Sequence, residues 1–491
     1  MKTGTILAIL GWLLFFLGVI LLIPLIISLV YDDGSWTAFL WSSLIGITIG
    51  GAFAYIFRAE KEINHREGFA IVGLSWILAA GLGALPYVFS GKIPNFIDAY
   101  FEAMSGFTTT GSTILKEVEV LSKSLLFWRA LTHWLGGMGI IILSLAILPI
   151  LGVGGMQLFK AEMPGPTKDK LAPRIQDTAR ILWGVYLLLT LLEIFFLMLS
   201  GMDLFDATCH AFATLATGGF STKTASVGGY ESATIDTIII IFMILAGMNF
   251  TLHYRILQGK IIKSIKGEEL KLYLGVGFGA TVFIMLSNWW NGIYGDMLEN
   301  LRYSAFQTWS ILTTTGFGTA DFDQWAPSAK TILVTLMFLG GMAGSTGGGI
   351  KHVRALIFLK FTKVQIKKLI HPMSVEAIKL DGKKIPQDVV QSILGFLSLY
   401  MVVGIVATVV VTFSGIDLVT GCTSVIATLN NIGPGLAGVG PAKNFADLPY
   451  PAKVVLTFCM VAGRLELYTI ALLFVPEYWR DARPPKTRWS R

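Results

Sequence analysis

Charged side chains are scarce in this sequence. Asp, Glu, Lys and Arg make up 14% of the 491 residues, whereas a soluble domain averages about 25%. Hydrophobic residues make up 54%, and several apolar runs reach about 20 residues, the length that crosses a bilayer as a helix. This composition excludes an ordinary soluble domain and predicts an integral membrane protein with several helical spans.

Cysteine is almost absent as well, with three residues in the whole chain. Cys209, Cys422 and Cys459 provide neither a disulfide framework nor the spacing of a metal site. The six histidines show no ligand spacing, and no Ser/His/Asp set, HExxH or DxD pattern lies on a predicted span. The sequence therefore predicts that the protein is not an enzyme.

The net charge of +7 is unevenly distributed along the chain. Most Lys and Arg residues lie in short segments between predicted spans, the pattern that the positive-inside rule describes for cytoplasmic segments. This pattern argues against nucleic-acid binding, places both termini in the cytoplasm and indicates an even number of crossings. The predicted cytoplasmic segments are 58–66, 157–180, 253–271, 351–384 and the tail from Arg480.

One pattern occurs four times: an acidic residue, a short amphipathic helix, and a Thr- or Asn-rich turn with a glycine. The first copy ends in "GFTTTGST" (106–113). Each copy lies between two apolar runs, and such internal periodicity indicates a repeated architecture. The matching glycines are predicted to be Gly111, Gly218, Gly316 and Gly433.

The predicted fold class is an all-α integral membrane protein with four span–pore-helix–span repeats. The repeats are expected in a pseudo-fourfold arrangement around a central pore, and two further spans precede them, which gives ten full crossings. The predicted divisions are 1–66 for the two N-terminal helices, 67–160, 161–262 and 263–384 for the first three repeats, and 385–491 for the fourth repeat and the cytoplasmic tail.

The polar turns suit the binding of a dehydrated cation. Irregular backbone at membrane depth must be buried in protein or line water, and a ring of backbone carbonyls can replace the hydration shell of an ion. Glycine permits the unusual dihedrals that such a ring needs, and the negative C-terminal end of each half-helix favours a cation. One such turn alone would be an ordinary reverse turn, but four framed copies favour an ion filter. The predicted ligands are Thr109, Thr110, Gly111, Thr217, Gly218, Thr314, Thr315, Gly316, Asn431, Ile432 and Gly433.

An acidic residue near the start of each half-helix is predicted to complement the positive end of the helix, and it could also cap that end. These residues are Asp98, Asp206, Glu299 and Asp417.

The four units, each with one matching glycine, resemble the Trk/Ktr/HKT superfamily of potassium transporters, and most of all its TrkH family of bacterial membrane subunits. In this superfamily four glycines form one selectivity filter, and a serine at the first position goes with sodium permeation in some plant members. Because the first position here is Gly111, the resemblance implies potassium selectivity. The fourth loop departs from the pattern: "TLNNIGPGL" lacks the TTG core, so an asymmetric ring is expected.

A glycine-rich segment, "FLGGMAGSTGGGIKH" (338–352), interrupts the second span of the third unit. A phosphate cradle is disfavoured, because the GxxxxGK spacing fails by one residue and no strand precedes it. Close helix packing through small residues is a further alternative. The favoured interpretation is a gate beneath the filter, as the resemblance also implies, formed by Gly344, Ser345, Thr346, Gly347, Gly348 and Gly349. This is the only glycine-broken span that the sequence predicts.

Arg464 lies within the last predicted span. A charge at this depth is costly and usually faces a pore or a partner. The alternatives are a pair with Glu466, a bond to a nearby carbonyl, or snorkelling. The resemblance favours a position in the pathway below the filter, where the arginine would act as an electrostatic barrier to cations.

The resemblance implies potassium uptake across the bacterial inner membrane, with potassium as the transported ligand and no nucleotide on this chain. The alternative is a sodium- or proton-coupled secondary transporter of another monovalent cation. The resemblance also implies a homodimer in the lipid bilayer, and it implies that this homodimer associates with a cytoplasmic NAD/ATP-binding regulatory subunit resembling TrkA. The nine basic residues of 351–384 are compatible with such docking or with ordinary positive-inside charge.

Overall fold

The computed structural model describes residues 3–57, 63–139, 175–260, 264–374 and 376–479. Within these ranges the chain is almost entirely helical, apart from a small antiparallel hairpin of β1 (Lys379–Leu380) and β2 (Lys383–Lys384). Parts of all five predicted cytoplasmic segments lie outside the described residues, namely 58–62, 157–174, 261–263, 375 and the tail from Arg480.

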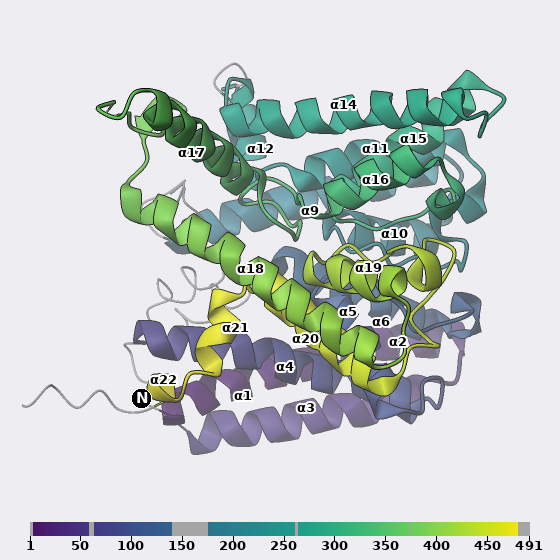
Figure 1. The fold of residues 1–491 in the computed structure, drawn as a ribbon. Coiled ribbons are helices and arrows are strands. Elements are labelled where there is room, and N and C mark those ends of the chain that lie inside the picture. The colour runs from purple at the N-terminus through teal and green to yellow at the C-terminus, as the bar shows by residue number, and fades with distance from the viewer. Residues whose placement is uncertain (1–2, 58–62, 140–174, 261–263, 375, 480–491) are drawn as a thin grey trace, which may run out of the picture.

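The first span consists of α1 (Thr3–Ile20) and α2 (Leu22–Tyr31), and α3 (Trp36–Ile56) returns beside it. Small residues let these backbones approach closely. A Cβ atom placed on Gly50 would lie 2.4 Å from the backbone nitrogen of Phe15, and one on Gly11 would lie 2.7 Å from that of Ala54. In Figure 1 α1 and α3 lie at one edge of the molecule, and α14 (Glu268–Trp290) lies at the opposite edge.

Each of the four units begins with a long helix. Six spans in the described part of the chain, including Thr3–Tyr31 and α3, are long and apolar enough to cross a bilayer. The bent pair of α11 (Ala233–Gly247) and α12 (Phe250–Leu257) makes a seventh if it is counted as one span. Many apolar side chains on these helices face outward, such as Phe278 (57% exposed) and Val402 (57% exposed), as lipid-facing residues do. The four opening helices are α4 (His65–Phe89), α9 (Ile175–Leu199), α14 (Glu268–Trp290) and α18 (Gln387–Phe413).

A short helix follows in each unit, as predicted. Three of them have 12 residues, which corresponds to about 18 Å and cannot cross a hydrocarbon core of about 30 Å. The chain then turns and returns toward the side of the molecule on which the short helix begins, called the outer side below, with the opposite side called the inner side. There each unit has one short 3-10 turn (η1 Val118–Val120, η3 Ser226–Tyr230, η4 Phe322–Gln324, η5 Ala437–Val439). The short helices, called pore helices below, are α5 (Phe96–Phe107), α10 (Leu204–Leu215), α15 (Met297–Leu312) and α19 (Leu418–Leu429).

The capping role predicted for the four acidic residues holds for only one of them. Asp417 accepts a hydrogen bond from the amide of Thr420 (3.0 Å) and caps α19. The other three helices begin one turn earlier than expected, with Asn95, Asp203 and Asp296 at the N-cap position. The predicted residues Asp98, Asp206 and Glu299 therefore lie in the first turn, where a negative charge still complements the helix dipole.

The second helix is interrupted within the described residues of the second, third and fourth units, so the prediction of a single glycine-broken span is wrong. In the first unit α6 (Lys123–Trp134) changes to the π-helix η2 (Leu135–Gly139), and residues 140–174 lie outside the described part. In the second unit α11 (Ala233–Gly247) and α12 (Phe250–Leu257) meet at 101°.

In the third unit, residues 338–351 separate α16 (Pro327–Met337) from α17 (His352–Ile370). In the fourth, α20 (Tyr450–Arg464) is followed by two residues with positive φ, Glu466 and Leu467, and then by α21 (Tyr468–Leu473) and α22 (Pro476–Trp479). The breaks lie where the second helices pass the ends of the pore helices. A Cβ atom on Gly136 would lie 1.8 Å from the carbonyl oxygen of Phe107, and one on Gly463 would lie 2.0 Å from that of Leu429.

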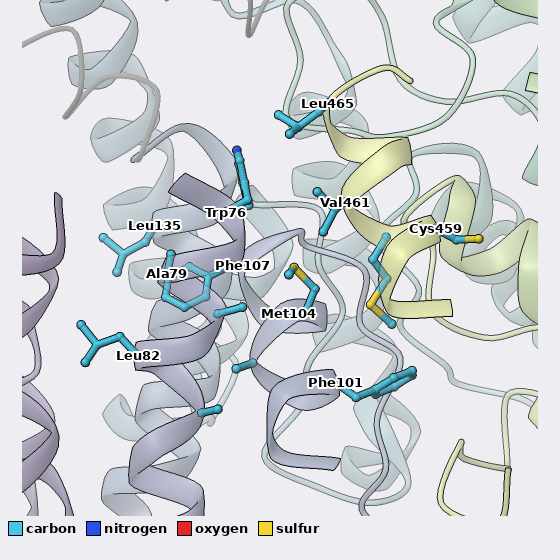
Figure 2. Packing of buried hydrophobic residues seen from close by; sticks show 14 of the residues in the cluster. Trp76, Ala79, Leu82, Phe101, Met104, Phe107, Leu135, Cys459, Val461 and Leu465 are labelled. Carbon is cyan, nitrogen blue, oxygen red and sulfur yellow. The ribbon is translucent and has the colours of Figure 1, made fainter. Parts of the chain in front are cut away.

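The largest hydrophobic cluster surrounds the first pore helix. Figure 2 shows Met104 and Phe107 of α5 between Trp76 and Ala79 of α4 on one side and Val461 of α20 on the other. All five side chains are at least 95% buried. Because interiors are packed as densely as organic crystals, this cluster holds the C-terminal end of α5 in one place.

Candidate functional site

The four pore helices end in the same turn. The amide two residues beyond each C-cap bonds back to the third carbonyl from the helix end, over 2.8 to 2.9 Å: Thr110 to Ser105, Gly218 to Ala213, Thr315 to Ser310 and Ile432 to Ala427. This is the Schellman arrangement, in which the residue after the C-cap is left-handed. The left-handed residues are Thr109 (φ 52°), Thr217 (φ 54°), Thr314 (φ 62°) and Asn431 (φ 54°).

Glycine normally occupies this left-handed position, and threonine is disfavoured there because its branched Cβ crowds the backbone. Such strained residues persist only where the surrounding structure holds them, and they cluster at functional sites. All four are completely buried. The same left-handed turn in all four units, with a strained threonine in three of them, therefore marks these loops as a candidate site. They are called filter loops 1 to 4 below and comprise 108–114, 216–222, 313–319 and 430–436.

The filter loops meet around one axis. A Cβ atom placed on Gly111 would lie 2.1 Å from the carbonyl oxygen of Gly218 in the next loop. The corresponding contacts continue in chain order and return from loop 4 to loop 1: Gly219 to Thr315 (2.1 Å), Gly316 to Ile432 (1.8 Å) and Gly433 to Thr110 (2.9 Å). We call this closed series the glycine–carbonyl ring.

Each glycine of the ring also has a positive φ, between 78° and 105°. A residue with a side chain would therefore be strained and would also collide with a carbonyl of the neighbouring loop. The ring gathers four carbonyl groups from four distant parts of the chain, those of Thr110, Gly218, Thr315 and Ile432.

In the second unit the predicted register is wrong by one residue. Gly219, not Gly218, corresponds to Gly111, because it lies two residues beyond the left-handed Thr217 and has a φ of 78°. Gly218 instead supplies the carbonyl of the ring. Gly218 is restricted to glycine for a different reason, since a Cβ atom there would lie 2.3 Å from Nδ1 of His133.

A polar side chain five or six residues before the end of each pore helix holds the outgoing part of its filter loop. Glu102 accepts the amide of Ile114 (3.0 Å), and Thr423 accepts that of Leu436 (3.0 Å). The amide oxygen of Gln307 accepts from the amide of Thr319 (2.8 Å) in the side-chain orientation that satisfies both groups. His210 Nε2 bonds to Ser221 Oγ (2.9 Å).

Further hydrogen bonds join neighbouring units on the outer side of the ring. Units 1 and 2 are joined by Val118 N to Thr224 Oγ1 (2.8 Å), units 2 and 3 by Gly228 N to Gly318 O (3.0 Å), units 3 and 4 by Ala437 N to Asp323 Oδ2 (3.1 Å), and units 4 and 1 by Phe445 N to Thr113 O (2.8 Å). The four outer loops therefore form a second closed series above the glycine–carbonyl ring.

The glycine-rich segment, residues 338–351, contacts the ends of three pore helices. Gly348 N donates to Thr314 Oγ1 (2.7 Å), and Thr346 Oγ1 donates to the carbonyl of Leu215 (2.9 Å). A Cβ atom on Gly348 would lie 2.4 Å from the carbonyl oxygen of Asn430. The segment thus packs against the same helix ends that carry the filter loops.

Backbone bonds hold the rest of this segment. Gly340 N donates to Ile350 O (3.0 Å), Met342 N to Gly247 O (2.8 Å), and Phe250 N to Gly344 O (3.0 Å). Gly344 and Gly349 have positive φ, which glycine tolerates. The predicted gate residues therefore form one compact loop and do not continue either neighbouring helix.

Arg464 joins this loop to filter loop 1. Its Nη1 donates to Thr109 Oγ1 (3.1 Å) and to the carbonyl of Thr346 (2.7 Å), and its Nη2 donates to the carbonyls of Gly136 and Gly137 (2.7 Å each). Among the alternatives that the sequence left open, the structure shows that Arg464 hydrogen-bonds to nearby carbonyls. These carbonyls belong to the glycine-rich segment and to η2, whereas Glu466 pairs with Arg354.

Sequence reasoning missed one buried ion pair in the site. Arg129 of α6 pairs with Glu102 of α5, with 2.7 Å between Nε and Oε1. The available signal was a charged residue within each of two largely apolar segments, which is costly at membrane depth.

Comparison with known proteins agrees with this architecture. Residues 36–481 match the family described as "TrkH: Cation transport protein". The chain is 43% identical over 478 residues to the Trk system potassium uptake protein TrkH of Escherichia coli K12, covering 96% of this chain and 98% of that protein. It is 36% identical to TrkG of the same organism, over 96% of this chain and 97% of TrkG.

A solved structure is similar over the same extent. The crystal structure of the potassium transporter TrkH from Vibrio parahaemolyticus superposes with a TM-score of 0.88 at 37% identity, covering 98% of this chain and all of that one. With the family match over most of the chain, this agreement in fold and sequence shows that the protein is a multi-pass membrane protein belonging to the TrkH family of cation transport proteins.

Proposed function

We propose that this chain mediates potassium uptake across the cell membrane by conducting the ion through the glycine–carbonyl ring. The observation that carries the proposal is the closed series of contacts from Gly111 through the four loops and back to Thr110. Carbonyl oxygens gathered around one axis can replace the hydration shell of a monovalent cation. Relatives at up to 43% identity are named potassium uptake proteins, which supports potassium as the ion.

The helix ends support a cation in particular. All four pore helices end at the ring, so four partially negative C-termini lie beside it. The filter loops themselves contain no carboxylate. Selection would therefore rest on carbonyl dipoles at fixed positions and on the ligands Thr109, Thr110, Gly111, Thr217, Gly218, Thr314, Thr315, Gly316, Asn431, Ile432 and Gly433, with Gly219 in addition.

We further propose that Gly344 to Gly349 form a gate and that Arg464 acts with it. The contacts of Gly348 with Thr314 and of Thr346 with Leu215 support a closed position against the filter. Arg464 contributes a positive charge, which repels cations, and it ties the gate to filter loop 1 through Thr109 and Thr346. Opening would require these bonds to break.

The proposed assembly follows the relatives. The name "Trk system" of the relatives supports a complex with other components, and we propose a homodimer with a cytoplasmic NAD/ATP-binding subunit resembling TrkA. The proposed location is the bacterial inner membrane with both termini cytoplasmic, supported by the basic segment 351–384.

Uptake of rubidium into reconstituted vesicles tests the proposal. The wild type is expected to take up rubidium with no imposed sodium or proton gradient. Gly111→Ser is expected to lose this uptake or its preference over sodium, because the new Cβ would collide with the carbonyl of Gly218. Gly184→Ser is the matched control, since nothing lies within 4 Å of its Cβ position. Uptake that strictly requires a sodium or proton gradient would favour the coupled secondary transporter, and uptake unaffected by Gly111→Ser would refute the filter.

A further inference from the structure

The buried ion pair of Arg129 and Glu102 is an unusual feature behind the filter. Their side chains are 3% and 0% exposed, and Nε lies 2.7 Å from Oε1. Removing two charges from water is expensive, and a hydrophobic pair of similar volume would often be as stable. An ion pair retained in such a place therefore calls for a role beyond stability.

The two residues hold different filter loops. Glu102 accepts hydrogen bonds from Ile114 N (3.0 Å) and Thr113 Oγ1 (3.0 Å), both in or at the end of filter loop 1. Arg129 Nη1 donates to the carbonyl of Ser221 (3.0 Å) in filter loop 2. The pair thus bridges the outgoing parts of two neighbouring loops.

Arg129 makes a second contact with filter loop 2. Its guanidinium carbon lies 3.7 Å from the centre of the Phe220 ring, a favourable cation–π distance. Four residues further along α6, His133 stacks on the same ring at 4.1 Å and an interplanar angle of 16°. Phe220 follows Gly219 of the ring directly, so one face of α6 sets the position of this part of the loop.

The other three units have no carboxylate where the first has Glu102, and the residues there are His210, Gln307 and Thr423. Among the described residues, this ion pair is the one that bridges two filter loops. We propose that Arg129 and Glu102 are positioning residues that hold these two loops at a fixed spacing and thereby contribute to ion selectivity. A carbonyl ring that can contract binds a smaller ion more readily, so a fixed spacing favours the larger one. This inference rests on the proposed function.

The test separates positioning from folding. Single removal of either partner leaves an uncompensated buried charge and destabilises the protein, so the informative variant removes both charges. Glu102→Gln/Arg129→Met keeps an acceptor for Ile114 N but removes the bridge to filter loop 2. The matched control is Asp236→Asn/Arg302→Met, which removes the ion pair between α11 and α15 (2.6 Å), a pair with no contact to a filter loop among the described residues.

We expect the double variant to be purified and to melt near the wild-type temperature. Its preference for rubidium over sodium, measured as sodium competition in vesicle uptake, should fall about tenfold, which corresponds to ~1.4 kcal/mol. The control should retain the wild-type preference. A double variant with wild-type preference, or a control that loses it equally, would overturn the inference.

A second variant covers the case in which the double variant does not fold. Arg129→Lys retains the charge but cannot reach both Glu102 and Ser221 with a planar fork. It should fold and show a smaller loss of preference, whereas an unchanged preference contradicts the positioning role. A wild-type protein that takes up no rubidium or shows no preference would instead refute the proposed function.

Discussion

The two sides of the glycine–carbonyl ring are held in different ways. On the outer side, four inter-unit hydrogen bonds close a second series of contacts, and the buried pair of Arg129 and Glu102 bridges two loops. On the inner side, a glycine-rich loop lies against the helix ends through backbone bonds, Thr346 and Arg464. The outer contacts form a closed series that involves all four units, whereas the inner contacts all involve one segment, residues 338–351, which bonds to units 2, 3 and 4.

This difference suggests a division of labour between the two sides. A filter must keep its oxygens at fixed positions, and a gate must move at small energetic cost. Glycines serve the two sides for different reasons. Those in the ring allow a close approach to the carbonyl of the neighbouring loop, and those in the inner loop allow non-helical backbone conformations between α16 and α17. Variants of each side should therefore change different properties of transport.

The largest effect is expected for Gly316→Ala in the ring. Its Cβ atom would lie 1.8 Å from the carbonyl oxygen of Ile432, and its φ of 82° strains any L-residue. Rubidium uptake in vesicles should be abolished. Gly279→Ala on α14 is the control, because nothing lies within 4 Å of its Cβ position. Wild-type uptake by Gly316→Ala would mean that the ring does not line the pathway.

A large effect of opposite sign is expected on the inner side. Arg464→Ala removes a fixed positive charge and four hydrogen bonds against the filter. Uptake of rubidium should rise about tenfold, equivalent to ~1.4 kcal/mol of barrier. Arg464→Lys keeps the charge and should remain closer to the wild type. A rate no higher than wild type in Arg464→Ala would exclude the barrier.

A smaller increase should follow Thr346→Val. The hydroxyl of Thr346 bonds to the carbonyls of Leu215 (2.9 Å) and Ala246 (3.3 Å), and the loss of one neutral hydrogen bond is worth about 1 kcal/mol, or about fivefold in an open–closed equilibrium. The fraction of open time in single-channel recordings measures this change. Thr346→Ser retains the hydroxyl and should match the wild type, and equal recordings for the valine and serine variants would contradict the role of this bond.

The smallest effect is expected at the outer link of Glu119 with Thr224. Glu119 accepts the amide of Thr224 (2.8 Å) on the protein surface. Burial alone would raise the pKa of Glu119, but the hydrogen bonds from Thr224 lower it below its ordinary value. The link therefore stabilises the fold above the ordinary pKa and is lost as the pH falls through the lowered pKa.

Glu119→Gln should accordingly change uptake by less than about twofold at pH 7, because exposed polar links contribute little. It should also remove part of the acid dependence of the melting temperature. Glu117→Gln, two residues away, provides the comparison. A large loss of selectivity in Glu119→Gln would contradict this expectation, because it would mean that the four inter-unit bonds cannot hold the outer loops in place without Glu119.

Much of the fold could be predicted because it depends on local sequence. The long apolar runs, the short amphipathic helices and the polar turns each fall within about 20 residues, and the turns at Gly111, Gly316 and Gly433 have the predicted register. In the second unit two glycines, Gly218 and Gly219, are adjacent, and the local sequence does not indicate which of them corresponds to Gly111. The choice depends on which residue meets Thr315 and which meets His133.

The breaks in the second helices show the same limit. The glycine-rich run 338–351 is visible in the sequence, but the breaks after Gly247 and after Arg464 each follow a single glycine, Gly247 or Gly463, which does not by itself predict a break. They arise because the ends of the pore helices pack against these positions, as the contact of Gly463 with the carbonyl of Leu429 illustrates.

The sequence by itself determined that the chain crosses a membrane, that it contains four related units, and that each unit carries a polar turn able to expose backbone oxygens. These properties follow from composition and from periodicity along the chain. Only the tertiary structure decided that the turns close into a ring, which glycine of the second unit belongs to it, and what Arg464 and Arg129 hold. These relations join residues from different units, about 100 positions apart, and no local pattern specifies which of many apolar surfaces will pack together.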